Sequence, residues 1–491
     1  MKYISINDVK IISHYLGRIM QATGIAFLVP VIVAIFYREF NCLIGFIISS
    51  GISLVLGTLL NHINPKNLNI HLKHGMIISS IAWIWASFLG AIVMTIILHL
   101  PLLDGMFENT STWTGTAFTL FTNIESLPHS ILFLRSFEGW LGGLGIVIIG
   151  ITILLRPGTS AAKIYKSEDK DERIKPSIIK TMHKTLEIYI VYTLIGIVLY
   201  ILAGLPIFDA VNLCFSMICT GGMSIKNQNI GFYHNNIIYI ISMVLMIMGA
   251  VSFPVHYKIM KTKGKALFRD VQFQTIIILI IASTLFILYL NKFISNEMLF
   301  TIIAAITTTG ANCIDPNIML SWKPGIIIIL MILMVIGGSS GSTVGGIKII
   351  RFITILKAIE KNVIEIVSPE GRIIKTKIKN KNISDKAIKE SCIYFLIFIQ
   401  LIIVSWIVLL SQGYDSCYSL FDIISAVSNN GLSLGMVNLS MPVVVKLTMI
   451  IDMLLGKLEI IPIIVLIRAL FEFGKLNKSQ KNKLKRIKAK L

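Results

Sequence analysis

Charged residues are scarce in this chain. They make up 14% of its 491 residues, whereas hydrophobic residues make up 55% and the mean hydropathy is +0.80. In an ordinary soluble domain about a quarter of the residues are charged, so this composition excludes a soluble fold of this length. Long apolar runs are abundant instead, and we expect a polytopic membrane protein.

Cysteine is scarce as well, and its spacing suggests neither a metal site nor a disulfide framework. The six cysteines include no Cys-x-x-Cys pair, and we interpret them as small buried hydrophobes. The apolar runs contain no His-x-x-x-His, no paired acid and base and no Ser/His/Asp set. We therefore expect no enzyme and no covalently bound cofactor. The N-terminus shows no signal-peptide cleavage pattern, so the first apolar run is expected to remain as a membrane helix.

Acidic residues are few relative to basic ones, with 25 Asp and Glu against 45 Lys and Arg and a net charge of +20. The basic residues gather in four connectors, with eight in 156–184, five in 256–269, eleven in 348–389 and eight in 475–490. Three stretches away from these connectors, 100–134, 206–235 and 412–440, together contain one Lys or Arg residue, Lys226. This asymmetry follows the positive-inside rule. It predicts a multi-pass protein of the plasma membrane with both termini cytoplasmic, and it makes nucleic-acid binding unnecessary as an explanation of the charge.

Ten apolar runs are long enough to cross a bilayer. They lie at about 16–37, 41–61, 75–99, 138–155, 185–205, 236–256, 271–291, 325–357, 389–411 and 443–471. We predict an all-α polytopic membrane protein with two leading transmembrane helices and four helix–pore loop–helix repeats, in pseudo-fourfold arrangement around one pore. The predicted boundaries are 1–70 for the leading helices, 71–165, 166–262, 263–360 and 361–474 for the repeats, and 475–491 for a basic cytoplasmic tail.

Within each repeat, a half-hydrophobic segment stops at a small residue. The stops are Thr116-Ala117, Thr220-Gly221, Thr309-Gly310 and Asn430-Gly431, and ten positions before each small residue stand Phe107, Val211, Phe300 and Phe421. Ten helical residues span about 15 Å, half a bilayer, and the carbonyl end of such a helix favours a cation. Glycine suits the reversal because it tolerates positive φ. We predict an ion filter of backbone oxygens, although any one stop alone is also compatible with an outer Thr/Gly turn.

The second span of the third repeat is interrupted by glycine and serine. The interruption comprises Gly337, Gly338, Ser339, Ser340, Gly341, Ser342, Thr343, Val344, Gly345 and Gly346. Five glycines in ten residues do not favour a helix, and free backbone inside a membrane requires water or protein around it. We predict a gate loop beneath the filter, with a kink at a helix–helix contact as the alternative. A nucleotide-binding P-loop is excluded, because Lys348 is not followed by Ser or Thr and no strand precedes the segment.

Charge occurs inside the last apolar run, at Asp452, Lys457 and Glu459. Ionisable residues within a membrane face a bundle interior or a pathway. Lys457 is therefore a candidate pore charge, which would impose a barrier on permeating ions or hold the gate loop. The alternative is an internal pair of Lys457 with Asp452 or Glu459 that only fixes packing.

Several motifs together resemble the Trk/Ktr/HKT superfamily of potassium transporters, and most closely its Trk-type membrane (H) subunit. The similarity extends from the first helix to the last. It is strongest at Leu127–Ser130, Trp140–Ile146, Phe208–Ala210, Ser216 with Thr220–Gly222, Thr307–Gly310, Gly337–Lys348, Ser425–Gly435 and Leu455–Glu459. Any single Thr-Gly is a weak signal, whereas the ordered set is specific.

The resemblance implies potassium uptake by channel-like conduction, in a transporter family that includes symporters. It implies K⁺ held at Thr116, Thr220, Thr309 and Asn430, with Ala117, Gly221, Gly310 and Gly431 as the small filter residues. It also implies a homodimer in membrane lipid that docks a cytosolic nucleotide-binding ring subunit of the Trk A type. Two residues depart from the family pattern: Ala117 stands where the family has Gly, and Lys457 where it usually has Arg. Ala117 motivates an alternative of the same fold, a Na⁺-permeable or weakly selective cation transporter.

Overall fold

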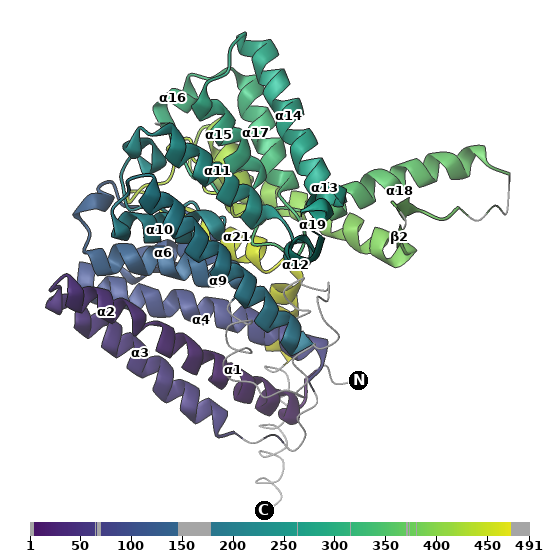
Figure 1. Ribbon diagram of the computed structural model, residues 1–491. Coiled ribbons are helices and arrows are strands. Elements are labelled where there is room, and N and C mark those ends of the chain that lie inside the picture. The colour runs from purple at the N-terminus through teal and green to yellow at the C-terminus, as the bar shows by residue number, and fades with distance from the viewer. Residues whose placement is uncertain are drawn as a thin grey trace, which may run out of the picture.

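A computed structural model describes residues 4–63, 65, 70–145, 178–262, 264–314, 316–369, 372, 374–379 and 381–472. The predicted basic tail 475–491, most of the connector 156–184 and the second half of the span predicted at 138–155 lie outside the described residues. The regular structure in the described part is almost entirely helical, which confirms the predicted all-α class (Figure 1). One small antiparallel hairpin, formed by β1 (Lys377–Ile378) and β2 (Lys381–Asn382), is the exception there.

The chain begins with three helices, α1 (Ile6–Ala26), α2 (Val29–Phe36) and α3 (Phe40–Asn61). Ser5 and Asp8 form a capping box that starts α1, and α1 with α2 makes one apolar span. Glycines allow α1 and α3 to pack closely, since a Cβ atom on Gly17 would lie 2.6 Å from the Gly57 carbonyl oxygen. In Figure 1, α1 and α3 lie side by side along one flank of the molecule.

Four groups of helices follow, each with a short helix between longer ones. The first group has α4 (Leu72–Leu98), α5 (Leu102–Thr114), η1 (Ile124–Ser126) and α6 (His129–Leu144). The second has α9 (Ile178–Leu202), α10 (Ile207–Ile218), η3 (Asn229–Tyr233), α11 (Asn236–Ala250) and α12 (Phe253–Thr262). The third has α13 (Lys265–Arg269), α14 (Val271–Asn291), α15 (Asn296–Ile306), α16 (Pro316–Leu320), α17 (Pro324–Ile336) and α18 (Ile349–Val367). The fourth has α19 (Asp385–Ser411), α20 (Ser416–Val427) and α21 (Val443–Lys457).

The short helices α5, α10, α15 and α20 contain 13, 12, 11 and 12 residues. At 1.5 Å per residue each is about half as long as a bilayer core is thick. Each begins just after a proline or a side-chain cap, at Pro101, Pro206, Ser295 and Asp415. Their residues are largely buried, so these helices lie inside the bundle and not against lipid.

Two predicted spans are not continuous helices, which corrects the sequence interpretation. Within 236–256 the chain bends by 109° between α11 and α12, and within 443–471 helix α21 ends at Lys457 before helix resumes over 461–472. In the described part, six helices are long and apolar enough to cross a membrane, and the bent pair would be a seventh. The bend is stabilised by the interrupted segment of the third group, because Ser339 N donates to Ala250 O at 3.1 Å.

Helix α18 extends away from the helical body together with the hairpin and the beginning of α19 (Figure 1). Arg351 near its start ion-pairs with Glu459 at 2.6 Å. Lys348, just before α18, ion-pairs with the same carboxylate at 2.7 Å. These contacts join the end of the interrupted segment to the break after α21.

Candidate functional site

The loops that follow α5, α10, α15 and α20 meet in a closed ring. A Cβ atom on Gly431 would lie 1.7 Å from Thr116 O, and one on Gly310 would lie 1.9 Å from Asn430 O. A Cβ atom on Gly222 would lie 1.9 Å from Thr309 O, and one on Gly115 would lie 3.7 Å from Thr220 O. Each loop therefore touches the backbone of its neighbour, in the order first, fourth, third, second and back to the first. The structure brings all four predicted stops together.

Hydrogen bonds define how the four loops correspond. In each, one backbone N–H donates to the carbonyl five residues earlier at 2.8–2.9 Å, and the four donors are Thr116, Gly221, Thr309 and Asn430. The residue after each donor has a left-handed backbone, with φ of 61° at Ala117, 64° at Gly222, 65° at Gly310 and 99° at Gly431.

The second loop is thus shifted by one residue from the predicted correspondence. We expected Gly221 to take the left-handed turn, and this expectation is wrong, because Gly222 takes it. The sequence Thr220-Gly221-Gly222 offers two adjacent glycines, and spacing alone did not distinguish them.

Ala117 adopts a conformation that an L-residue other than glycine rarely adopts. Its φ of 61° costs on the order of 1 kcal/mol. Gly115, two residues earlier, has a φ of 72°, so both residues have left-handed backbone. The first loop therefore keeps the shape of the others despite the missing glycine.

Side-chain hydrogen bonds that the sequence did not predict reinforce the ring, including those of Asn430, which was expected only as a filter residue. Asn429 donates to the Thr116 hydroxyl at 3.0 Å and to Met453 O at 2.8 Å, which joins the fourth loop to the first. Asn430 donates to Ala305 O at 3.0 Å, which joins the fourth loop to α15. These residues are 313 and 125 positions apart in sequence from their partners, so no local spacing signals the contacts.

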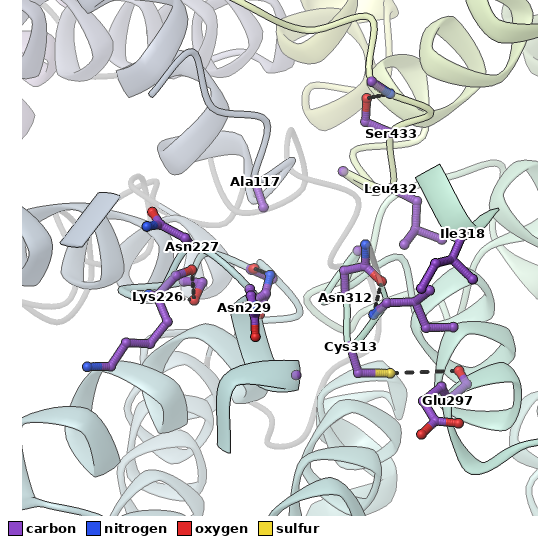
Figure 2. A pocket seen from close by; sticks show the side chains of 18 of the residues that line it. Ala117, Lys226, Asn227, Asn229, Glu297, Asn312, Cys313, Ile318, Leu432 and Ser433 are labelled. Atoms are coloured by element: carbon purple, nitrogen blue, oxygen red, sulfur yellow. Dashed lines mark hydrogen bonds between the residues drawn. The ribbon is translucent and has the colours of Figure 1, made fainter. Parts of the chain in front are cut away.

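A cavity of about 1000 Å³ opens on one side of the ring, lined by residues that follow the stop in all four loops (Figure 2). In Figure 2, Ala117, Asn229, Asn312 and Leu432 approach the same space from separate loops. The lining includes Lys226, which is 3.6 Å from Asp209 and lies over the ring of Phe232.

The predicted gate segment Gly337–Gly346 lies against the opposite side of the ring, where it contacts residues at the stops or just before them. Gly345 N donates to the Thr308 hydroxyl at 2.8 Å, and the hydroxyls of Thr220 and Thr343 are 2.8 Å apart. A Cβ atom on Gly345 would lie only 2.0 Å from Ser428 O. The segment is mostly buried, and the cavity at this side measures only about 40 Å³.

Lys457 reaches this segment. Its Nζ donates to Thr343 O at 3.3 Å and lies 5.8 Å from the ring centre of Trp83. Of the two acids in the same run, Asp452 accepts from Ser405 at 2.7 Å, and Glu459 pairs with Lys348 and Arg351. Lys457 thus lies where the gate segment and the ring meet.

The described residues contain no group of three or more His, Cys, Asp or Glu side chains arranged to hold a metal ion. The groups that converge in the ring are backbone carbonyl oxygens and hydroxyl oxygens. Such oxygen ligands suit weakly held monovalent cations, which exchange their hydration shell for protein oxygens.

Comparisons with known proteins agree with this architecture. The family model TrkH, described as a cation transport protein, matches residues 39–317 and 296–479. An uncharacterized cation transporter from Methanocaldococcus jannaschii is 38% identical over 467 residues, covering 94% of this chain and 96% of that protein. The Trk system potassium uptake protein TrkG from Escherichia coli is 27% identical over 483 residues, covering 95% and 99%. The crystal structure of the potassium transporter TrkH from Vibrio parahaemolyticus matches with a TM-score of 0.81 at 24% identity, covering 93% and 98%.

Proposed function

Because the chain belongs to the TrkH family of cation transport proteins, we propose that it conducts K⁺ into the cell through a backbone-lined pore. It is a multi-pass membrane transporter and not an enzyme. The observation that carries the proposal is the closed ring of four loops, each in contact with the next. The similar Trk proteins are potassium uptake proteins, which supports K⁺ as the ion.

In the proposed filter, carbonyl oxygens of Thr116, Thr220, Thr309 and Asn430 and of their neighbours replace the hydration shell of K⁺. The backbone correspondence adds the carbonyl of Gly221 to this set. The four short helices end at the ring, so the negative ends of their dipoles favour a cation there. The left-handed turns at Ala117, Gly222, Gly310 and Gly431 reverse the chain after the filter.

We further propose that the segment Gly337–Gly346 is the gate. Its contacts with Thr220, Thr308 and Ser428 place it across the side of the ring away from the large cavity. Lys457 holds the segment through Thr343 O and adds a positive charge that opposes cation passage. Conduction then requires the segment and Lys457 to move away from the ring.

The remaining partners follow from the family resemblance and from the charge distribution. We propose a plasma-membrane protein with cytoplasmic termini, a homodimer, and a cytosolic nucleotide-binding ring subunit of the Trk A type as regulator. The basic connectors would face that regulator or anionic lipid.

Uptake of Rb⁺ or K⁺ by a potassium-uptake-deficient cell tests the function. Cells that express the chain are expected to take up Rb⁺, and Gly51→Ala is a suitable matched variant, because a Cβ atom at this position would contact nothing within 4 Å. Absence of uptake with and without the regulator, in cells whose membranes contain the protein, would contradict the proposal.

A second candidate, a Na⁺-permeable transporter of the same fold, is favoured by Ala117 alone. A strained alanine at 61° allows the Thr116–Ala117 peptide to relax, which would turn one carbonyl away and weaken discrimination against Na⁺. Reversal potentials in K⁺/Na⁺ mixtures separate the two candidates. Ala117→Gly is expected to raise the permeability ratio of K⁺ to Na⁺. An unchanged ratio would show that Ala117 is not a filter residue.

A further inference from the structure

Two of the four short helices carry a buried carboxylate at the same position. Glu108 of α5 stands eight residues before Thr116, and Asp422 of α20 stands eight residues before Asn430. Both residues are 0% exposed. The corresponding positions of α10 and α15 hold Leu213 and Thr301.

Each carboxylate binds the extended segment that follows its own loop, and the register is identical. Glu108 accepts hydrogen bonds from the Thr119 hydroxyl at 2.9 Å and from Leu120 N. Asp422 accepts from the Ser433 hydroxyl at 2.8 Å and from Leu434 N at 2.9 Å. We call these two arrangements the carboxylate clamps. In both, the bound residues stand three and four positions after Thr116 or Asn430.

The other two loops are held differently. The Thr301 hydroxyl donates to Glu297 O at 2.8 Å, on its own helix, and Leu213 has an apolar side chain. Because Gly431 abuts Thr116 O, the first and fourth loops are neighbours in the ring, so the two clamped loops make up one contiguous half of it.

The clamp of the first loop includes a buried cation. Arg135 of α6 lies 3.4 Å from Glu108, and their side chains are 1% and 0% exposed. Arg135 also donates to the Thr119 hydroxyl at 2.9 Å and to Ser224 O of the second loop at 3.3 Å. A buried ion pair with further hydrogen bonds fixes geometry firmly, because neither charge can leave its partner without large cost.

The clamp of the first loop coincides with the one non-glycine residue among the four turns that directly follow the hydrogen-bond donors; in the other loops the residues before the donors, Thr220, Thr308 and Asn429, also have positive φ. Ala117 lies two residues before Thr119, whereas the other three loops have glycine at the corresponding position. A strained backbone persists only where its surroundings over-determine it. We propose that Glu108 is a positioning residue that holds Ala117 in its left-handed turn and so orients the Thr116 carbonyl toward the ion. This inference rests on the proposed conduction through the ring.

The test is the permeability ratio of K⁺ to Na⁺, from reversal potentials of the purified full chain in bilayers. Glu108→Gln keeps the side-chain shape and is expected to lower the ratio at least threefold. Adding Ala117→Gly is expected to restore the ratio to within twofold of Ala117→Gly alone, because glycine adopts positive φ without a clamp. Thr301→Val, a near-isosteric change at the corresponding position of α15, is expected to leave the ratio unchanged.

A purely structural role of Glu108 would lower thermal stability without this rescue. The inference is overturned if Glu108→Gln keeps the wild-type ratio, or lowers it equally with Ala117 and with Gly at 117. If Glu108→Gln does not accumulate, Thr119→Val takes its place, since it removes the hydroxyl that donates to Glu108 and accepts from Arg135 and leaves the Glu108–Arg135 pair. It is expected to lower the ratio about twofold, and an unchanged ratio overturns the inference.

A wild-type chain without cation flux would contradict the proposed function, and a second readout then decides the inference independently. A density map of Glu108→Gln is expected to show the Thr116–Ala117 peptide rotated, and a peptide in its present orientation would overturn the inference. In the double variant with Ala117→Gly the peptide is expected to return to the orientation of wild type.

Discussion

Lys457 places a positive charge between the ring and the gate segment, where it donates to Thr343 O. At an effective dielectric constant near 20, two unit charges 4 Å apart interact by about 4 kcal/mol, enough to govern passage of a cation. Lys457→Met is expected to raise Rb⁺ uptake at least tenfold at equal protein level, because the barrier and the contact with the segment both disappear.

Lys457→Arg is the matched control, since it keeps the charge and can still donate to a carbonyl. It is expected to give uptake close to wild type. Wild-type uptake in Lys457→Met would show that the charge of Lys457 does not oppose the passage of cations.

At the residue scale, sequence spacing located the stops but not what holds them. Ala117, Gly310 and Gly431, which the ten-residue spacing singled out, take the left-handed turn, whereas the two adjacent glycines of the second loop left its register open by one. The sequence did not indicate the role of Asn429, because its partner Thr116 is 313 positions away. It did not indicate the role of Glu108 either, because its partner Leu120 lies in a loop without helical or strand periodicity. Polar residues buried by tertiary contacts carry no such local pattern.

The gate segment makes a glycine-dependent contact with the ring. A Cβ atom on Gly345 would lie 2.0 Å from Ser428 O, so Gly345→Ala forces the segment away from the ring. We expect a several-fold increase of Rb⁺ uptake through a gate that no longer closes. Gly51→Ala on α3 should leave uptake unchanged, and reduced uptake in Gly345→Ala at equal protein level would show that the segment does not close the pore.

Glu39 caps the beginning of α6 from the turn between α2 and α3. It accepts from His129 N at 2.6 Å, from Ser130 N at 2.9 Å and from the Ser130 hydroxyl at 2.6 Å. Burial raises the pKa of this carboxyl, but the hydrogen bonds from Ser130 and His129 together outweigh burial and hold the pKa below its ordinary value of 4.5. The ionised form thus stabilises the junction of α2, α3 and α6.

Glu39→Gln is expected to lower stability at pH 7 by about 1 kcal/mol, which is typical of a lost helix cap. Since the folded pKa is depressed, the contribution of Glu39 is present above pH 4.5 and is lost as the pH falls through the folded value. Tm in detergent, measured for both proteins from pH 7 to pH 3, should show a deficit that narrows toward low pH. Glu360→Gln removes an exposed pair with Lys357 and should not change Tm.

At the element scale, hydropathy predicted where apolar segments lie but not where they bend. The interruption at Gly337–Gly346 was evident from its glycines, whereas the bend after α11 and the break after Lys457 lie within the runs 236–256 and 443–471, each of which was predicted as one span. At the bend after α11 the backbone is compensated by a tertiary contact, the hydrogen bond from Ser339 N to Ala250 O. A hydropathy average over a sequence window contains no information on such contacts.

The predicted orientation of the whole molecule can be tested with its own cysteines. Cys417 is exposed at the start of α20, and Cys392 lies near the other end of α19. From Cys392 to the end of α19 at Ser411 the helix spans about 30 Å, the thickness of a bilayer core, so we expect the two thiols near opposite sides of the membrane. Because Cys313 lines the large cavity beside the ring, the experiment uses a Cys313→Ser background, in which a membrane-impermeant maleimide added to intact cells is expected to label Cys417 and Cys417→Ser should abolish the signal. Labelling that appears only after permeabilisation would show that the orientation is opposite to the predicted one.

All four loops of the ring belong to one polypeptide, and each abuts the next. The composition of the ring is therefore fixed at translation, unlike that of an assembly from separate identical subunits. Co-expression of an intact and a defective copy cannot yield mixed rings, so a damaged allele would reduce flux in proportion to its dose. The quarters are equally free to diverge in sequence, as alanine at 117 beside glycine at 222, 310 and 431 already illustrates.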